Sequence, residues 1–200
     1  AIVTIGNALL FKAPPGIGNP EAVVNLGSSM TATNGFDNFS YPNFLEYRTA
    51  KSLSGLSAIR FETMELSLAG PNGGEHVGAG VASGNLFEVL QVRPALGRFF
   101  VAEEDGAPGA NPAVVLSHKF WSEHYSADRD IVGKSITLNA YPSSVVGVAP
   151  AEFKGPLIVA PDMWVTISGS TLLQFNARLL NSRQSVFIMG VGRLAKDATM

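Results

Sequence analysis

The fold is decided by residues 83–100, which read SGNLFEVLQVRPALGRFF. Ser83 is expected to cap a short helix, because a serine hydroxyl accepts a hydrogen bond from a free N–H of the first turn. The apolar residues of that helix face inward: Leu86, Phe87, Val89 and Leu90. Pro94 then stops it, since proline has no N–H and restricts the residue before it. These side chains form no catalytic constellation. This central segment (residues 83–100) is therefore predicted to act through shape and movement.

Composition favours an α+β fold in which strands dominate. The chain has 200 residues, of which 46% are apolar and only 15% are charged, against about 25% charged in an average domain. Its 21 glycines and 12 prolines favour strands and turns over long helices. The net charge of −2, without a basic run, predicts no nucleic-acid partner. The absence of cysteine excludes disulfides, thiolate metal sites and thiol nucleophiles in this chain.

The two ends are expected to lie inside a larger protein. The apolar residues 1–11 have no basic region before them, unlike a signal peptide. They are either an ordinary buried first element or the end of a transmembrane helix. No apolar run reaches the roughly 20 residues that span a bilayer. A Pro/Gly-rich linker follows at residues 12–20. The sequence ends at residues 196–200, where a new helix is expected to begin.

Periodicity places the elements of the first half. A strand is predicted at residues 21–27, a polar loop at 28–38, and a helix at about 41–51 with Ser40 as its N-cap. From Ser57 apolar residues alternate with polar ones, and their phase slips by one at Thr63, which predicts a bulge. A turn at 70–74 leads to a hairpin partner containing Val77, Ala79 and Val81.

The second half is also rich in strands. We predict a short buried strand at 113–116, then a helix capped by Ser117 that carries Phe120 and Trp121. Residues 135–138 and 143–148 form a hairpin, and extended pieces cover 157–159 and 163–167. A polar stretch, 168–183, precedes the apolar run 186–191.

Metal and phosphate sites are not predicted. His118 and His124 are six residues apart and do not share a helix face as a zinc pair would, and His76 is distant in sequence. The glycines of Gly78-Ala79-Gly80 lack the spacing of a dinucleotide fingerprint, so they are interpreted as small residues that admit a neighbouring backbone.

Acidic and aromatic groups offer two further candidates. Glu103, Glu104 and Asp105 would supply carboxylates for glycoside cleavage or calcium, but without alternating oxygen ligands they are interpreted as a solvated acidic turn. Asp128 and Asp130 are interpreted as a polar turn as well. The remaining aromatic residues would suit a sugar-stacking platform but are predicted to be core: Trp121, Trp164, Phe99, Phe100 and Phe153. We assign no catalytic, cofactor-binding or metal-ligating residue.

The central segment resembles the extracytoplasmic core domain of MacB-type ABC transporter permeases. The resemblance rests on six ordered blocks that cover nearly the whole chain: Ser83-Gly84-Asn85-x-Phe87-x-x-Leu90 with Pro94-x-x-Gly97-Arg98-x-Phe100, Ser40-Tyr41-Pro42-x-Phe44-x-x-x-Arg48, Val114-Val115-Leu116-Ser117-x-x-Phe120-Trp121, Val132-Gly133-Lys134-x-Ile136-x-Leu138-Asn139 with Val145-Val146-Gly147-Val148-Ala149-Pro150-x-x-Phe153, Asp162-x-Trp164-Val165, and Gly192-Arg193-Leu194. Ala140 departs from the family pattern, which often has glycine there, and Thr166 stands where proline is common.

The resemblance implies a porter-like β-α-β unit with an inserted β-rich subdomain. It divides the chain into the end of a transmembrane helix and linker (1–20), a porter-like segment (21–82), the inserted subdomain (83–184) and a returning, truncated porter strand (185–200). Residues Thr4 to Leu10 would be the outer tip of the first transmembrane helix. The subgroup with two such domains in one long chain is the most similar.

The resemblance also implies a non-catalytic role on the extracytoplasmic, periplasmic face of the bacterial inner membrane. The domain would be anchored by the transmembrane part of the same permease, pair with a second permease copy, follow a cytoplasmic ATPase and meet a periplasmic adaptor, as in efflux or export. Two alternatives stay open: a free-standing carbohydrate- or peptide-binding module that uses the aromatics, and a hydrolase built on the acidic loop.

Overall fold

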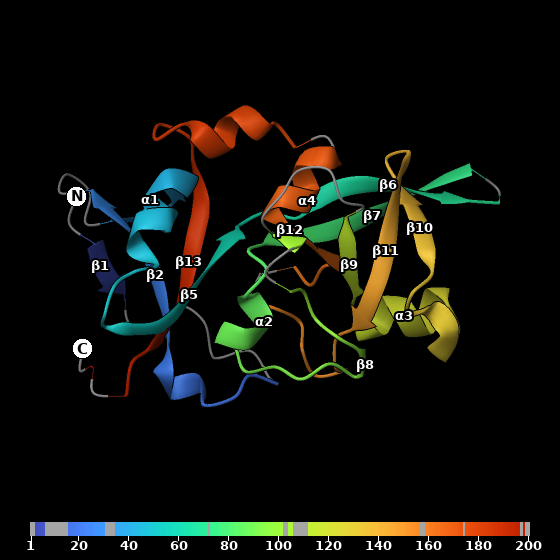
Figure 1. Ribbon diagram of the computed structural model, residues 1–200, viewed down its shortest axis with the longest axis horizontal. Coiled ribbons are helices and arrows are strands. Elements are labelled where there is room, and N and C mark those ends of the chain that lie inside the picture. The colour runs from blue at the N-terminus through green and yellow to red at the C-terminus, as the bar shows by residue number, and fades with distance from the viewer. Residues whose placement is uncertain are drawn as a thin grey trace.

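The computed structural model describes residues 3–6, 16–30, 35–71, 73–101, 104–105, 112–156, 159–173, 175–196 and 198. These residues form four α-helices and thirteen strands that belong to one hydrogen-bonded sheet (Figure 1). The predicted α+β class with dominant strands is confirmed. None of the described helices is long and apolar enough to cross a membrane.

One part of the sheet is open and antiparallel. Its strands follow the order β1 (Val3–Gly6), β2 (Val23–Met30), β13 (Val186–Leu194) and β5 (Leu53–Arg60). Strands from the two ends of the chain are therefore neighbours, and both termini lie at the same end of the molecule (Figure 1). Two short strands, β3 (Gly35–Asp37) and β4 (Phe39–Ser40), extend this part, and a 3-10 turn, η2 (Pro20–Ala22), precedes β2.

Helix α1 (Tyr41–Tyr47) packs beside β13 and β5. The predicted N-cap is confirmed, because the Asn43 N–H donates to Ser40 Oγ at 3.4 Å. Pro42 in the first turn costs little there, since its missing N–H would have no partner inside the helix. The helix ends at Tyr47, earlier than the predicted Lys51.

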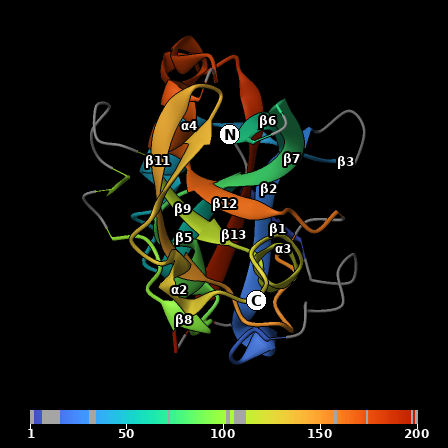
Figure 2. The same cartoon turned by 90° about the vertical axis from the view of Figure 1, so that its right-hand side faces the viewer.

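The other part of the sheet is a closed ring. Its strands are β7 (Gly73–Ala82), β12 (Met163–Thr166), β9 (Ala113–Leu116), β11 (Tyr141–Val148), β10 (Ser135–Leu138) and β6 (Met64–Gly70), and β6 pairs with both β10 and β7. Figure 2 shows this part of the molecule facing the viewer. The predicted hairpins β6–β7 and β10–β11 are confirmed. Leu66, Leu68 and Leu138 point their apolar side chains into the ring's core.

Short helices cover the ring and its junction with the open part. They are α2 (Leu86–Val89), α3 (His118–His124) and α4 (Ile167–Leu172), with 3-10 turns η4 (Arg129–Ile131) and η5 (Ala177–Asn181). Ser117 caps α3 as predicted, accepting from the Phe120 N–H at 3.1 Å. Strand β8 (Leu96–Gly97) adds to β11. The two parts meet where Ile59 of β5 pairs with Ala82 of β7.

The predicted bulge at Thr63 is wrong. Strand β5 ends at Arg60 and β6 begins at Met64, and the two are separate strands: β5 pairs mainly with β13 and meets β7 only at Ile59, whereas β6 pairs with β7 along its whole length. The alternation of apolar and polar residues shifts by one position because β5 and β6 are two strands, each with its own buried face. Two further regions differ from the prediction. The polar stretch 168–183 contains most of α4 and all of η5, and strand pairing continues to Met30 where a loop from residue 28 was expected.

The first described residues of the expected transmembrane tip form a strand. Val3–Gly6 form a strand antiparallel to β2, with Thr4 opposite Gly27. Their backbone hydrogen bonds run to a neighbouring strand of the same chain, and the assignment of residues 1–20 as a whole remains a prediction. Residues 7–10 lie outside the described residues, as do Pro14 and Pro15 of the predicted linker.

The division of the chain at residues 20, 82 and 184 remains a prediction. Strand pairing places β6 and β7, which belong to the expected porter-like segment, among the strands of the ring. The open part combines β2 and β5 with β13, so it contains strands from both ends of the chain.

Candidate functional site

The central segment lies at the junction between the open sheet and the ring, and it begins differently from the prediction. Ser83 does not cap α2. The N-cap is Asn85, which makes no capping hydrogen bond from its side chain. Ser83 is buried, and its hydroxyl accepts a hydrogen bond from the Ala58 N–H at 3.0 Å. The hydroxyl turns toward β5 because the Ala58 N–H, left without a strand partner there, needs an acceptor.

A small polar network fixes this start to β5. Ser83 Oγ lies 2.9 Å from Ser57 Oγ and donates to Asn85 Oδ1 at 2.7 Å. The Asn85 side-chain amide donates to the Leu56 carbonyl at 3.0 Å, and the Ser83 N–H donates to the Ala58 carbonyl at 2.8 Å. A buried hydroxyl is tolerated only when it is bonded. The Ser-Gly-Asn sequence is thus a clamp on one edge of β5.

The acidic loop holds the same segment from the other side. Asp105 Oδ2 accepts from the Gly84 N–H at 2.8 Å, and Ser168 Oγ lies 3.5 Å from Asp105 Oδ1. A side chain at Gly84 would come within 3.0 Å of the Asp105 Cβ, so glycine suits this contact. The solvated acidic turn predicted for this loop is wrong for Asp105. Glu103 lies outside the described residues.

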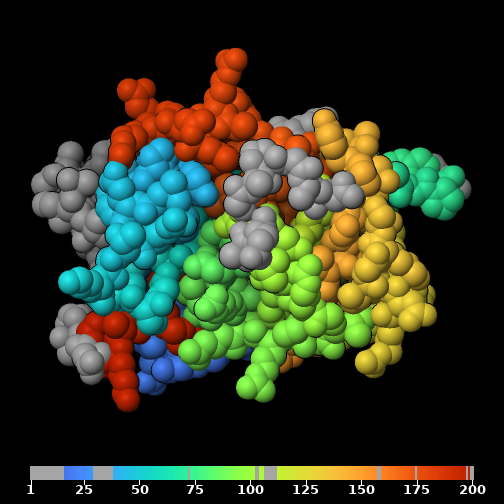
Figure 3. Space-filling view, viewed as in Figure 1, coloured from blue at the N-terminus to red at the C-terminus, as the bar shows by residue number. Residues whose placement is uncertain are grey.

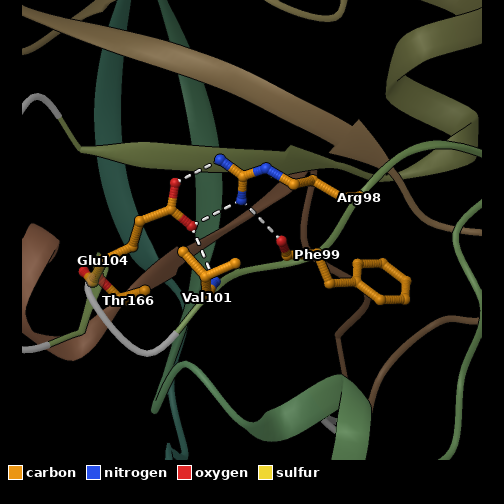
Figure 4. A network of polar contacts seen from close by, with 5 residues as sticks. All are labelled: Arg98, Phe99, Val101, Glu104 and Thr166. Atoms are coloured by element: carbon orange, nitrogen blue, oxygen red, sulfur yellow. Dashed lines mark hydrogen bonds and ion pairs between the residues drawn. The ribbon is translucent and has the colours of Figure 1, made fainter.

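Glu104 forms a bidentate ion pair with Arg98 (Figure 4). Its carboxylate accepts from Arg98 Nη2 at 2.7 Å and Nη1 at 2.9 Å, and from the Val101 N–H at 2.9 Å. The Arg98 guanidinium also donates to the Phe99 carbonyl, and Thr166 Oγ1 donates to the Glu104 carbonyl at 3.1 Å. The loop therefore connects the end of the central segment to the end of β12.

The pKa values of the two neighbouring carboxyl groups, Asp105 and Glu104, are shifted in opposite directions. Burial raises the pKa of Asp105, and its hydrogen bonds to Gly84 and Ser168 only partly oppose this. Burial acts in the same sense on Glu104, but the Arg98 guanidinium and the Val101 N–H outweigh it and lower the pKa of Glu104. Burial, helped by the charge of Asp105, also raises the pKa of the Tyr41 phenol.

A cavity of about 300 Å³ lies between α1, the central segment and Asp105. In the space-filling view, α1 and the central segment lie side by side on one face (Figure 3). The polar and aromatic groups that line the cavity include Tyr41, Arg48, Asn85, Glu88, Phe100 and Asp105. Its best-buried polar groups, Ser83 and Asp105, bind backbone N–H groups. This arrangement positions segments relative to one another.

The histidines are spread over the ring part. His76 is exposed on β7, and His124 stacks on Phe120 at 4.8 Å between ring centroids with its Nδ1 3.4 Å from a Glu75 oxygen. His118 contacts Trp121 edge to face. Within the described part of the chain, no three His, Asp or Glu side chains gather where they would hold a metal ion.

The aromatic residues are mainly core, as predicted. Trp164 is 1% exposed and contacts Phe153 and Phe87, while Phe99 stacks on Phe87 at 3.8 Å. Phe100 is also buried. Trp121 is half-buried, and its indole N–H donates to the Asp128 carbonyl at 2.8 Å. These rings do not form an exposed stacking platform.

The remaining candidates have structural partners. Gly80 admits the Trp164 indole, since an added Cβ would lie 2.5 Å from that ring, so the expected neighbour is a side chain and not a backbone. Asp128 accepts from the Asp130 N–H and pairs with Lys134 at 2.8 Å, which confirms the polar turn.

Arg193 is a residue whose role sequence analysis missed. It is 7% exposed near the end of β13, and its guanidinium donates to three backbone carbonyls: those of Val89, Asn19 and Gly18. A single arginine inside the apolar strand 186–194 was the signal available, because charged residues are rarely buried without partners.

The fold is that of extracytoplasmic domains from ABC transporters. The periplasmic region of MacB from Actinobacillus actinomycetemcomitans matches with a TM-score of 0.65 and 13% identity over 92% of this chain and 78% of that one. The extracellular domain of the noncanonic ABC-type transporter YknZ from Gram-positive bacteria matches with a TM-score of 0.59 and 12% identity over 88% and 85% of the two chains. A search among curated proteins found no match.

The sequence itself establishes the family. Residues 1–199 match the model of the MacB-like periplasmic core domain. The chain therefore belongs to this family and is an extracytoplasmic domain of a MacB-like ABC transporter permease.

Proposed function

We propose that this domain transmits conformational change, driven by ATP on the cytoplasmic side, to a periplasmic substrate or partner protein. The observation that carries the proposal is the adjacency of the terminal strands. β2 and β13 pair along four residues, and β13 pairs in turn with β5. A displacement that enters at this end is passed on through backbone hydrogen bonds.

The path from the open sheet to the ring is short and stiff. Ile59 of β5 pairs with Ala82 of β7, and one residue further along Ser83 is bonded to Ser57 and Ala58. Interiors packed at crystal-like density transmit strain. We infer that the central segment is the joint at which movement of the porter-like part reaches the ring.

In this proposal two permease copies form a pair. A cytoplasmic ATPase drives their movement, and in efflux members the domain acts on a periplasmic adaptor. A free-standing sugar-binding module is disfavoured, because Trp164, Phe100 and Phe153 are buried. A hydrolase on the acidic loop is disfavoured because Glu104 and Asp105 are bonded to Arg98 and to backbone N–H groups.

Cross-linking in the full-length permease tests the proposal. Leu45→Cys and Arg48→Cys introduce thiols at exposed positions on and just after α1, in a 200-residue domain that has no cysteine of its own; any cysteines in the rest of the permease are replaced first. Cross-links between two copies should form to different extents with and without ATP. Lys119→Cys on α3, at the opposite end of the molecule, is the matched control. Identical cross-linking of the α1 positions in both states would contradict the proposal.

A further inference from the structure

Arg193 joins three segments that are far apart in the sequence. Its Nε donates to the Val89 carbonyl at 2.6 Å, Nη1 to the Asn19 carbonyl at 3.0 Å and Nη2 to the Gly18 carbonyl at 2.6 Å. One side chain of β13 therefore holds the last turn of α2 and the linker before β2. None of the ion pairs between described residues includes it.

The described part of the linker before β2, residues 16–19, fits closely onto the central segment. The Gly18 N–H donates to the Leu90 carbonyl at 3.0 Å, and a Cβ on Gly18 would lie 2.8 Å from the Cβ of Gln91. Gln91, two residues after the end of α2, has the left-handed conformation with φ of 53°. Ile17 packs against the apolar cluster that contains Phe87 and Leu90. Residues 16–19 are thus closely packed against α2 and the residues that follow it, and we call this contact the linker seat.

The Arg193 hydrogen bonds that hold the linker are polar contacts, and they lie beside two clefts on the surface. The carbonyls at the end of a helix carry partial negative charge, and they suit a guanidinium. Two clefts, of about 380 and 520 Å³, adjoin Arg193, one lined by Glu88 and Gln91 and the other by Asn19 and Glu21. When the linker leaves Arg193, water in these clefts can solvate the guanidinium and the freed carbonyls. The surface exposed by this movement is therefore partly polar.

We propose that the linker docks reversibly on the central segment, and that Arg193 is the positioning residue that controls docking. This inference rests on the proposed function and names the contact through which movement of the N-terminal connection reaches α2 and β13. In the docked state the linker, α2 and β13 move as one body. In the released state the linker moves without them.

Disulfide trapping in the full-length permease with its ATPase tests the inference. Gly18→Cys and Gln91→Cys place two thiols in the docked contact, where a shift of about 1 Å gives disulfide geometry. The rate of disulfide formation should be high in one nucleotide state. It should fall about tenfold in the other, as when a state drops to a tenth of the population. Equal rates with and without ATP would overturn reversible docking.

Variants of Arg193 test its part. Arg193→Met should slow the 18–91 disulfide in both states, and Arg193→Lys should restore part of the rate because it keeps a charge and donors but loses the planar fork. Arg183→Met is the matched control, since Arg183 is exposed and binds Asn43 and Glu46 on α1. An unchanged rate in Arg193→Met would show that Arg193 does not control docking.

The two proposals fail in different ways. If cross-linking at Leu45 depends on nucleotide while the 18–91 disulfide does not, the linker is a fixed part of the domain and only this inference is lost. If neither depends on nucleotide, the proposed transmission of movement is lost as well. Melting of each variant, compared with the parent, separates loss of docking from loss of the fold.

Discussion

Gly155→Ala is predicted to destabilise the domain far more than an ordinary Gly→Ala change. Trp164 of β12 is enclosed between two glycines: an added Cβ would lie 2.5 Å from its ring at Gly80 and 2.3 Å from its ring at Gly155. The indole is 1% exposed, and Phe87 and Phe153 pack against it. A methyl group at Gly155 therefore has to displace the ring, and with it the packing of Phe87 and Phe153.

Two terms set the size of the effect. Gly155 has φ of +78°, where alanine costs about 1–2 kcal/mol, offset by about 0.4–1 kcal/mol because alanine restricts the unfolded chain. Overpacking against Trp164 adds about 1–3 kcal/mol. The sum is about 1–5 kcal/mol, which corresponds to a melting temperature lower by about 2–20 °C in a domain of this size.

Urea unfolding followed by tryptophan fluorescence measures the change, with Gly133→Ala as the matched control. Gly133 has φ of +88° but nothing within 4 Å of an added Cβ, so it carries the conformational term alone. We expect it to lose about 1 kcal/mol or less. If Gly155→Ala costs no more than Gly133→Ala, the close packing of Trp164 is not a constraint on this fold, and the argument is refuted.

Three further changes probe the turn and the acidic loop. Ala140→Gly should stabilise the domain by about 0.5–1 kcal/mol in the same unfolding assay, because Ala140 is exposed with φ of 68°; a loss would contradict this. Asp105→Asn should stabilise it at neutral pH, and the gain should vanish below the unfolded pKa, because a raised pKa means that the ionised form is the costly one. Glu104→Gln should destabilise it at neutral pH, with a loss that disappears in acid, because its lowered pKa reflects the bond to Arg98; parallel pH profiles for the two variants would refute the assignment.

Much of the fold is predictable from the sequence because it rests on local signals. Ser40 and Ser117 cap helices as expected, and the turns at 70–74 and 139–140 join hairpins. Asn139 and Ala140 have φ of 46° and 68°, so the tight turn is formed even though its second residue is not glycine. Such features depend on residues within a few positions of one another.

The closure of the ring was not predictable in this way. It depends on a single registered pair between β6 and β10, Leu68 with Leu138, reinforced by Asn139. Asn139 Oδ1 accepts from the Ser67 N–H at 2.8 Å, and its amide donates to the Leu173 carbonyl at 3.1 Å. The alternation of apolar and polar residues identifies a strand but does not show which other strand it pairs with.

The candidate site was missed for the same physical reason. Ser83 bonds to Ser57 across 26 residues, Asp105 to Gly84 across 21, and Arg193 to Gly18 across 175. In a linear sequence Ser83 resembles a helix cap and Asp105 a solvated turn, because each has local neighbours that suit that role. The competing long-range bonds win because burial removes water as an alternative partner and makes an unbonded polar group costly.

These long-range bonds share one property that bears on function. Ser83, Asp105 and Arg193 each form at least one bond to a backbone group: to the Ala58 N–H, to the Gly84 N–H, and to the carbonyls of residues 18, 19 and 89, respectively. A contact to backbone fixes the position of a segment whatever side chains it carries. Under the proposed transmission of movement, such contacts would hold neighbouring segments together where they meet. The joint around residues 83–105 and the linker seat at Arg193 are therefore where changes in coupling, without changes in overall stability, are to be sought.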